Sequence, residues 1–124
     1  MSTTPQHTAW SQVPVEPMNA LLDRQFLSGA NLTISRITLR KGAIVPRHSH
    51  ANEQAACLLS GCLKFVLFES EESPREIILR PDEVLIIPPN IPHEAHALED
   101  TINLDLFAPP RQDWISGDDA YLRR

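Results

Sequence analysis

The sequence has little of several residue types that mark specialised classes of protein. Only four glycines and two cysteines occur in 124 residues, and two cysteines are too few for a disulfide framework. Cys57 and Cys62 lie in apolar runs, which favours buried free thiols. No apolar run is long enough to cross a bilayer, and the first residues lack the basic and apolar regions of a secretory signal. We therefore expect one globular domain in the cytoplasm, without a membrane partner.

Clustered positive charge is also missing. The net charge is −5, and no basic stripe offers a surface for nucleic acid or for an anionic membrane. These absences exclude the classes of protein that bind polyanions, and they leave a small molecule as the expected partner.

Turn residues divide most of the chain into short apolar runs. Four pairs of runs are separated by only two or three residues, as in "LLDRQFLS" and "LTISRITLR" on either side of residues 29–31. The other pairs are "QAACLL" with "CLKFVLF", "EIILR" with "EVLII", and "EAHAL" with "TINLDLF". Aliphatic and β-branched runs without a long helical period predict four successive hairpins in an all-β sandwich or barrel. The acidic segment 69–75 is expected to be a solvated hairpin tip.

The two ends of the chain differ from this pattern. Residues 1–19 contain three prolines among polar residues and predict an extended N-terminal arm. Residues 20–108 form the predicted barrel, and residues 109–124 form a C-terminal tail that begins with two prolines. We expect the tail to form one or two short helices that pack on the barrel through three anchors, Trp114, Tyr121 and Leu122.

Two histidines, His48 and His50, lie one residue apart ahead of an apolar run. Residues two apart in a strand face the same side, roughly 7 Å apart at the backbone, so both imidazoles can converge on one ion. Gln54 shares their parity, whereas Glu53 points to the other face. We expect His93, which follows a buried strand and a rigid Pro-Pro turn, to complete the site. Surface or core histidines are the alternative to a metal site.

The spacing around these residues resembles the first signature of the cupin superfamily. That signature starts at Gly42, includes His48, His50 and Gln54, and ends at Gly61. A glutamate usually occupies the position of Gln54, so this chain departs from the family pattern there.

A second cupin signature extends from Asp82 through Pro88 and Asn90 to His93. Asp82 and Asn90 stand where the family usually has glycine, and both tolerate a left-handed turn better than most residues. Ala97 replaces the terminal asparagine of this signature. Together the two signatures imply a double-stranded β-helix, the cupin or jelly-roll barrel, with a metal bound by the polar residues of both.

A site made of His48, His50, Gln54 and His93 would leave a divalent cation with its full charge, because imidazole and amide ligands are neutral. Such an ion is a strong Lewis acid that attracts anions, and the neutral ligands disfavour the higher oxidation states of oxygen chemistry. Nitrogen and oxygen ligands suit one divalent transition metal ion, Mn, Fe, Co, Ni or Zn. The predicted cofactor is one such ion, and the predicted partner is a small carboxylate-bearing substrate.

The last strand-like segment supplies further candidates. Asn103, Asp105 and Phe107 share one face by the period of two. Asp105 is a candidate acid–base residue and Phe107 a wall that binds substrate. Arg111, which follows two prolines, is a candidate clamp for a carboxylate in binding and catalysis. A salt bridge between Asp105 and Arg111 that closes the strand is the alternative.

The segments "HSHANEQ", "IPPNIPH" and "LDLFAPPRQDW" together resemble the KdgF family of small cupins. The resemblance implies an enzyme that converts 4,5-unsaturated monouronates from pectin and alginate into their linear keto form. It implies a metal held by the three histidines and Gln54, and a pocket formed by Asp105, Phe107 and Arg111. It also implies a homodimer, formed through an outer sheet face and an N-terminal strand. The proline-rich arm and the C-terminal "SGDDAYLRR" depart from that family.

Two other functions remain open from the sequence. A quercetinase-type dioxygenase would use the same barrel with a large apolar cavity and a metal that reacts with oxygen. A non-catalytic cupin would bind a small molecule without converting it.

Overall fold

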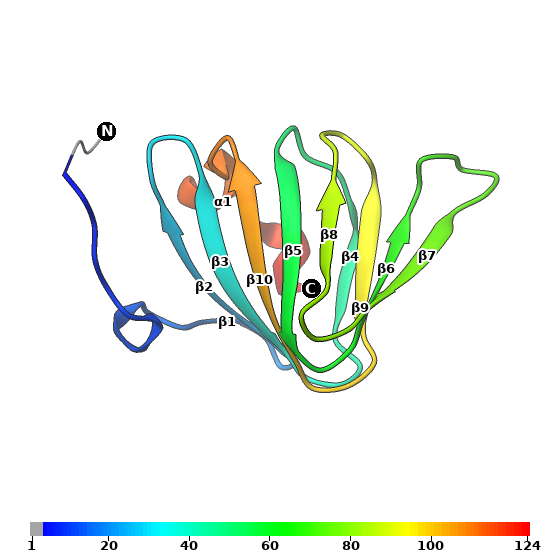
Figure 1. Cartoon of the computed structure of the whole chain (residues 1–124), viewed down its shortest axis with the longest axis horizontal. Helices are drawn as coiled ribbons and strands as arrows, with labels where there is room; N and C mark the ends of the chain where they lie inside the picture. Colours follow the sequence, from blue (N-terminus) through cyan, green and yellow to red (C-terminus); the bar gives the residue numbers. More distant parts are fainter. Residues whose placement is uncertain (1–3) are drawn as a thin grey trace.

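The computed structural model describes residues 4–124, which form two antiparallel sheets on either side of one core (Figure 1). The strands are β1 (Glu16–Asn19), β2 (Leu22–Ser28), β3 (Thr33–Leu39), β4 (Ile44–His48), β5 (Glu53–Ser60), β6 (Leu63–Leu67), β7 (Arg75–Leu79), β8 (Val84–Ile87), β9 (His93–Ala97) and β10 (Thr101–Ala108). The helices are η1 (Trp10–Gln12), α1 (Gln112–Ile115) and η2 (Ala120–Arg123). No helix among the described residues has the length and apolar character that crossing a membrane requires.

The strand order confirms the predicted all-β jelly-roll fold. One sheet has the order β1-β2-β3-β10-β5-β8 and the other has the order β4-β9-β6-β7. Side chains alternate between the two faces, as β3 shows, where Ile37 and Leu39 are buried while Arg36 and Thr38 are half-buried. Phe65 and Leu67 of β6 belong to the same core cluster on the other sheet. The apolar face of each sheet therefore fills the space between the sheets.

Three of the four predicted hairpins are wrong. β2 pairs with β3 as expected, but β5 and β6, β7 and β8, and β9 and β10 lie in opposite sheets. A short turn at the end of a strand has similar residues whether the chain folds back along its own sheet or crosses to the facing sheet. Turn residues therefore predict where the chain turns, but they do not predict which two strands pair. The acidic segment 69–75 does connect a pair of antiparallel strands, β6 and β7.

The substitutions in the second cupin signature have the expected backbone conformation. Asp82 and Asn90 have φ angles of 71° and 67°, in the left-handed region that glycine usually occupies. Gly61 has a stricter requirement, because a Cβ atom there would lie 2.3 Å from the Asp100 carbonyl oxygen. The turn between β5 and β6 consequently excludes any side chain at this position.

Segments near both ends of the described chain pack on the sheets. Within the segment expected to be an extended arm, β1 pairs with β2, and the Gln25 side chain donates hydrogen bonds to the carbonyls of Trp10 and Val13. At the other end, η2 contacts β1 of one sheet and β4 of the other. Trp114 and Leu122 are buried, as expected of tail anchors. Both cysteines are unpaired, and they are half-buried rather than buried.

Candidate metal centre

Three of the predicted metal ligands meet between the sheets. His48 ends β4 and His93 begins β9, and the two residues are cross-strand partners. The candidate donor atoms of His48, His50 and His93 all lie within 4.8 Å of one another. His50 lies beyond the end of β4, so strand parity does not orient it. Two hydrogen bonds hold it instead, from its Nδ1 to the Asn52 carbonyl and from the Asn90 amide to its own carbonyl.

The backbone fixes the protonation pattern of all three imidazoles. Nδ1 of His48 lies 2.8 Å from the Pro46 carbonyl oxygen, and Nδ1 of His93 lies 2.8 Å from that of Ile91. A carbonyl oxygen only accepts hydrogen bonds, so each Nδ1 carries the proton and each neutral ring keeps its lone pair on Nε2. Such second contacts are typical of histidines that bind metal through Nε2.

The rings are neutral because the site is shielded from water. Burial, followed by the neighbouring His93, lowers the pKa of His48 to about 3. Burial, followed by the charge of Arg111, lowers the pKa of His50 to about 4. Burial also lowers the pKa of His93. At neutral pH these side chains are available as ligands and need not lose a proton first.

Gln54 adds an oxygen to this group. It is buried on β5, and its Oε1 lies 3.1 Å from His50 Nε2. Its Nε2 donates a hydrogen bond to Asp105 Oδ1 at 2.9 Å, which fixes the orientation of the amide. Because His50 already carries its proton on Nδ1, two lone pairs face each other at Oε1 and Nε2. A cation between them would turn this unfavourable contact into two ligand bonds.

A cation therefore fits the donor set. His93 Nε2 is buried and has no hydrogen-bond partner within residues 4–124, and an unsatisfied buried acceptor is costly. A metal ion bound by three imidazole nitrogens and one amide oxygen would satisfy it, and this ligand set suits a divalent transition metal. Glu53 is exposed on the opposite face of β5, as parity predicted.

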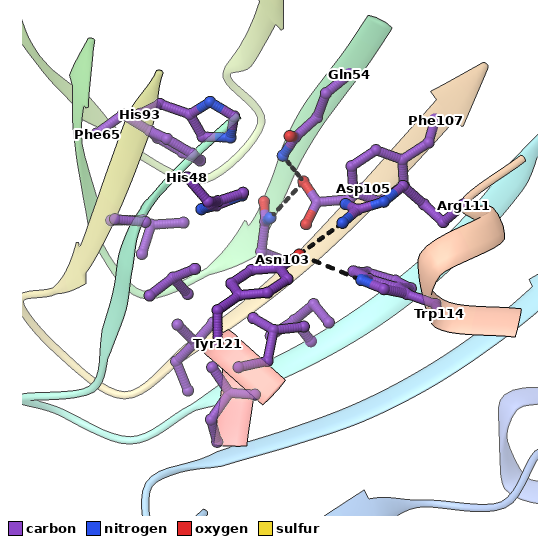
Figure 2. Close-up of a pocket in the computed structure, with 17 residues that line it drawn as sticks. His48, Gln54, Phe65, His93, Asn103, Asp105, Phe107, Arg111, Trp114 and Tyr121 are labelled. Atoms are coloured by element: carbon purple, nitrogen blue, oxygen red, sulfur yellow. Dashed lines mark hydrogen bonds between the residues drawn. The ribbon is translucent and has the colours of Figure 1, made fainter. Parts of the chain in front are cut away.

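Asp105 lies beside this group, on the interior face of β10. Its Oδ1 accepts hydrogen bonds from Gln54 and from Asn103 Nδ2, both at 2.9 Å (Figure 2). Burial raises the pKa of Asp105 to about 6, although the two amide donors and Arg111 act in the opposite direction. The carboxyl group can therefore exchange a proton near neutral pH. Asn103 was predicted on this face without a role, and its contact with Asp105 gives it one.

Arg111 is buried and is held by the tail. Its Nε and Nη2 donate to the two carboxylate oxygens of Asp113, at 2.9 and 2.7 Å. Nη2 also donates to the Tyr121 hydroxyl at 2.5 Å. Within residues 4–124, Arg111 thus forms its ion pair with Asp113. The alternative expectation, a salt bridge between Arg111 and Asp105, is wrong. Nη1 has no hydrogen-bond partner in the described part of the chain. Burial alone would lower the pKa of Arg111, but Asp113 and Tyr121 outweigh it and raise the pKa.

A pocket joins His48 and His93 to Asp105 and the tail. Phe107 lines it and is almost fully buried, with Arg111 over its ring at 4.7 Å. Asn52, which sequence reasoning missed, donates to the carbonyls of Pro109 and Pro110 and so joins the His50 loop to the segment that carries Arg111. Only the fold reveals this contact, because the residues are 57 and 58 positions apart. The apolar end of the pocket is formed by Leu22, Ile37, Leu39, Val45, Leu63, Phe65, Ala95 and Leu122.

Comparisons with solved structures show the same fold. The chain is 22% identical to KdgF from Halomonas sp. over 84% of this chain and 94% of that chain, with a TM-score of 0.74. It is 23% identical to an RmlC-like cupin from Shewanella frigidimarina, over 92% and 99% of the two chains, with a TM-score of 0.79. It is 16% identical to oxalate decarboxylase from Bacillus subtilis, a protein with Mn(II) centres, over 88% of this chain and 30% of that chain, with a TM-score of 0.74.

The family itself is shown by sequence. No curated protein matches the chain, but the family model described as the Cupin domain matches residues 35–108. This region contains His48, His50, Gln54 and His93, and the match extends over more than half of the chain. The chain therefore belongs to the cupin family.

Proposed function

We propose that this cupin is a metal-dependent enzyme that acts on a small anionic sugar acid. The specific reaction proposed is the KdgF-like conversion of a 4,5-unsaturated uronate into its linear keto form. The observation that supports it is the position of Asp105, a buried carboxyl with a pKa of about 6, next to four neutral donors that face one another. A bound divalent ion would be held by His48, His50, Gln54 and His93 and would supply Lewis acidity. Manganese is a candidate, as are iron, cobalt, nickel and zinc.

Asp105 is the proposed catalytic acid–base residue. Its Oδ1 is occupied by two amide donors, which leaves Oδ2 for a ligand. In the proposed reaction, Asp105 takes the proton of the hemiacetal hydroxyl as the ring C–O bond breaks, and passes it to the ring oxygen, which becomes an enol. It then moves the enol proton to the adjacent carbon, so that a ketone forms and no atom is gained or lost.

Arg111 and Phe107 are the proposed substrate-binding residues. The buried guanidinium of Arg111 places a positive charge on the pocket wall, which favours a carboxylate. Its Nη1 is the nitrogen left for that carboxylate, since Nε and Nη2 bind Asp113 and Tyr121. Phe107 packs beneath the guanidinium and keeps water from that side of the ligand.

The test of this function is the absorbance of the conjugated double bond of an unsaturated uronate. The metal-loaded protein should abolish this absorbance, because the product lacks the double bond. Asp105→Asn should keep the metal and lose most turnover, on the order of 10²-fold or more. Asp118→Asn, a change at an exposed acid of the tail, should behave as wild type. Full turnover by Asp105→Asn would remove Asp105 from the mechanism, and no turnover by the loaded wild type would refute the function.

The apolar end of the pocket favours a second candidate, a quercetinase-type dioxygenase. Oxygen uptake with a flavonol, in the presence of iron, copper, nickel or manganese, would support it. A non-catalytic binding role would be supported instead if an unsaturated uronate bound without conversion.

We also propose a cytoplasmic homodimer that associates through the outer face of the six-stranded sheet. Val84 and Ile86 of β8 are more than half exposed there. Their cross-strand partners on β5 are Cys57 and Ala55, so an apolar strip extends across two strands. Apolar strips of this kind are typical of subunit contacts. The two unpaired thiols are compatible with a reducing compartment.

A further inference from the structure

Tyr121 is fixed at the pocket wall by contacts that are distant from it in the sequence. Arg24 Nη2 and Asp119 Oδ2 form an ion pair of 2.7 Å between side chains that are 1% and 3% exposed. The Asn19 side chain donates to the Leu122 carbonyl at 3.2 Å. These bonds anchor the tail on both sides of Tyr121, so the aromatic ring has a defined position rather than that of a frayed terminus.

The phenol hydrogen of Tyr121 has a predictable direction. Arg111 Nη2 lies 2.5 Å from the phenol oxygen, and Trp114 Nε1 lies 3.3 Å from it (Figure 2). Guanidinium and indole nitrogens only donate hydrogen bonds, so the oxygen accepts both. The hydroxyl keeps its own hydrogen, and no acceptor within residues 4–124 binds it. Because the guanidinium charge polarises the O–H bond, this hydrogen is a strong donor.

Tyr121 belongs to the same pocket as His48 and His93. Tyr121 lines that pocket, and its ring lies 4.7 Å from the ring of His48, tilted by 31°. A ligand large enough to reach both the histidine group and Arg111 would therefore pass the Tyr121 hydroxyl.

A second polar group in the pocket lacks a partner, and it has the opposite polarity. Asn103 is 2% exposed and lines the pocket. Its Nδ2 is bound to Asp105, and its Oδ1 is buried without a hydrogen-bond partner in the described part of the chain. A buried acceptor of this kind would be satisfied by a ligand hydroxyl.

We propose that Tyr121 is a specificity-determining residue that donates a hydrogen bond to a carboxylate oxygen of the bound ligand, while Asn103 Oδ1 accepts one from a hydroxyl of the same ligand. The site then selects hydroxy acids, which present both groups. This inference rests on the proposed function for its substrate class, and it assigns Arg111 a second task, which is to hold and polarise Tyr121.

The test uses a saturated uronate, D-galacturonate, which lacks the double bond of the reaction. Tyr121→Phe keeps the ring and removes the hydroxyl. Titration of the Zn(II)-supplemented protein by calorimetry should show an increase in Kd of roughly tenfold in this variant. Ile115→Ala, a change at an exposed position of the same tail, should leave Kd unchanged. Zinc content equal to that of wild type and a cooperative thermal unfolding transition would show that both variants fold.

A second measurement needs no substitution. Tyr121 is the single tyrosine of the chain, so protein labelled with carbon-13 at the tyrosine Cζ gives one resonance, and D-galacturonate should shift it whereas D-galactose should not. An unmoved resonance in the presence of D-galacturonate, or a wild-type Kd for Tyr121→Phe, would overturn the proposal. Binding through Tyr121 without conversion of the unsaturated uronate would refute the proposed function alone. Conversion with an unchanged Kd in Tyr121→Phe would refute this inference alone.

Discussion

Gln54→Glu is the substitution that probes the charge of the site most sharply. The two side chains have the same shape, and glutamate is usual at this position of the family signature. Here, however, Gln54 Nε2 donates to Asp105 Oδ1 at 2.9 Å. In the variant, a carboxylate oxygen would replace this donor, and two buried carboxylates would face each other without a cation.

The expected cost follows from that contact. Loss of a hydrogen bond to a charged group costs about 1.5–3 kcal/mol. The repulsion between the carboxylates adds to this until one of them takes up a proton. A total of about 2–4 kcal/mol is reasonable for the metal-free protein. At about 3–5 °C per kcal/mol for a chain of this size, Tm should fall by about 6–20 °C.

A bound metal should offset this loss of stability in Gln54→Glu. A glutamate ligand neutralises half of the charge of a divalent ion, so the ion should stabilise Gln54→Glu more than it stabilises wild type. Thermal unfolding followed by circular dichroism, with EDTA and with Mn(II) or Zn(II), measures both effects. Glu53→Gln, on the exposed face of the same strand, is the control and should change neither. The reasoning fails if metal-free Gln54→Glu is as stable as wild type, or if metal raises its Tm by no more than that of wild type.

Three further predictions concern the frame around the site. Asp119→Asn should lower the free energy of unfolding by about 3 kcal/mol at neutral pH, because it leaves buried Arg24 without its closest carboxylate. Burial alone would raise the pKa of Asp119, but its arginine partners lower it. The stability that Asp119 contributes to wild type is therefore present above about pH 4 and disappears as pH falls through its lowered pKa. The free energies of unfolding of wild type and variant in urea should consequently converge in acid. Gly61→Ala should cost more than 2 kcal/mol in urea unfolding, since its Cβ meets the Asp100 carbonyl; a loss under 1 kcal/mol contradicts this. Ile86→Lys should give a monomer in light scattering where wild type is a dimer, and a dimeric variant would exclude the outer face.

Local sequence patterns were enough to predict which side chains share a face within a single strand. The period of two placed Gln54 and Glu53 on opposite faces of β5, and it placed Asp105 and Phe107 on the same face of β10. Gln54, Asp105 and Phe107 are buried and Glu53 is exposed. These predictions succeeded because strand parity depends only on the pleat, which any strand with one buried face must obey. The left-handed conformation of Asp82 was predictable for a similar reason, since it depends on residue type and turn position.

Long-range pairing was not predictable in the same way. The sequence suggested Asp105 as the partner of Arg111, but the structure pairs Arg111 with Asp113. The direction of the chain after β10 decides between these two carboxylates. Tyr121 was identified as a packing anchor, but its contact with His48 joins residues far apart in the sequence and depends on how the tail crosses between the sheets. Three of the four predicted hairpins failed for the same physical reason, because the choice of partner strand is made by the packing of two sheets rather than by a turn.

The central claim is that His48, His50, Gln54 and His93 hold one divalent transition metal ion. Its most direct measurement is the metal content of the purified protein by elemental analysis, followed by calorimetric titration of the EDTA-treated protein with Mn, Fe, Co, Ni and Zn. We predict one bound ion per wild-type chain for at least one of these metals, and its loss in a folded His93→Ala variant. Failure of every metal to bind wild type, or undiminished binding by His93→Ala, would contradict the account.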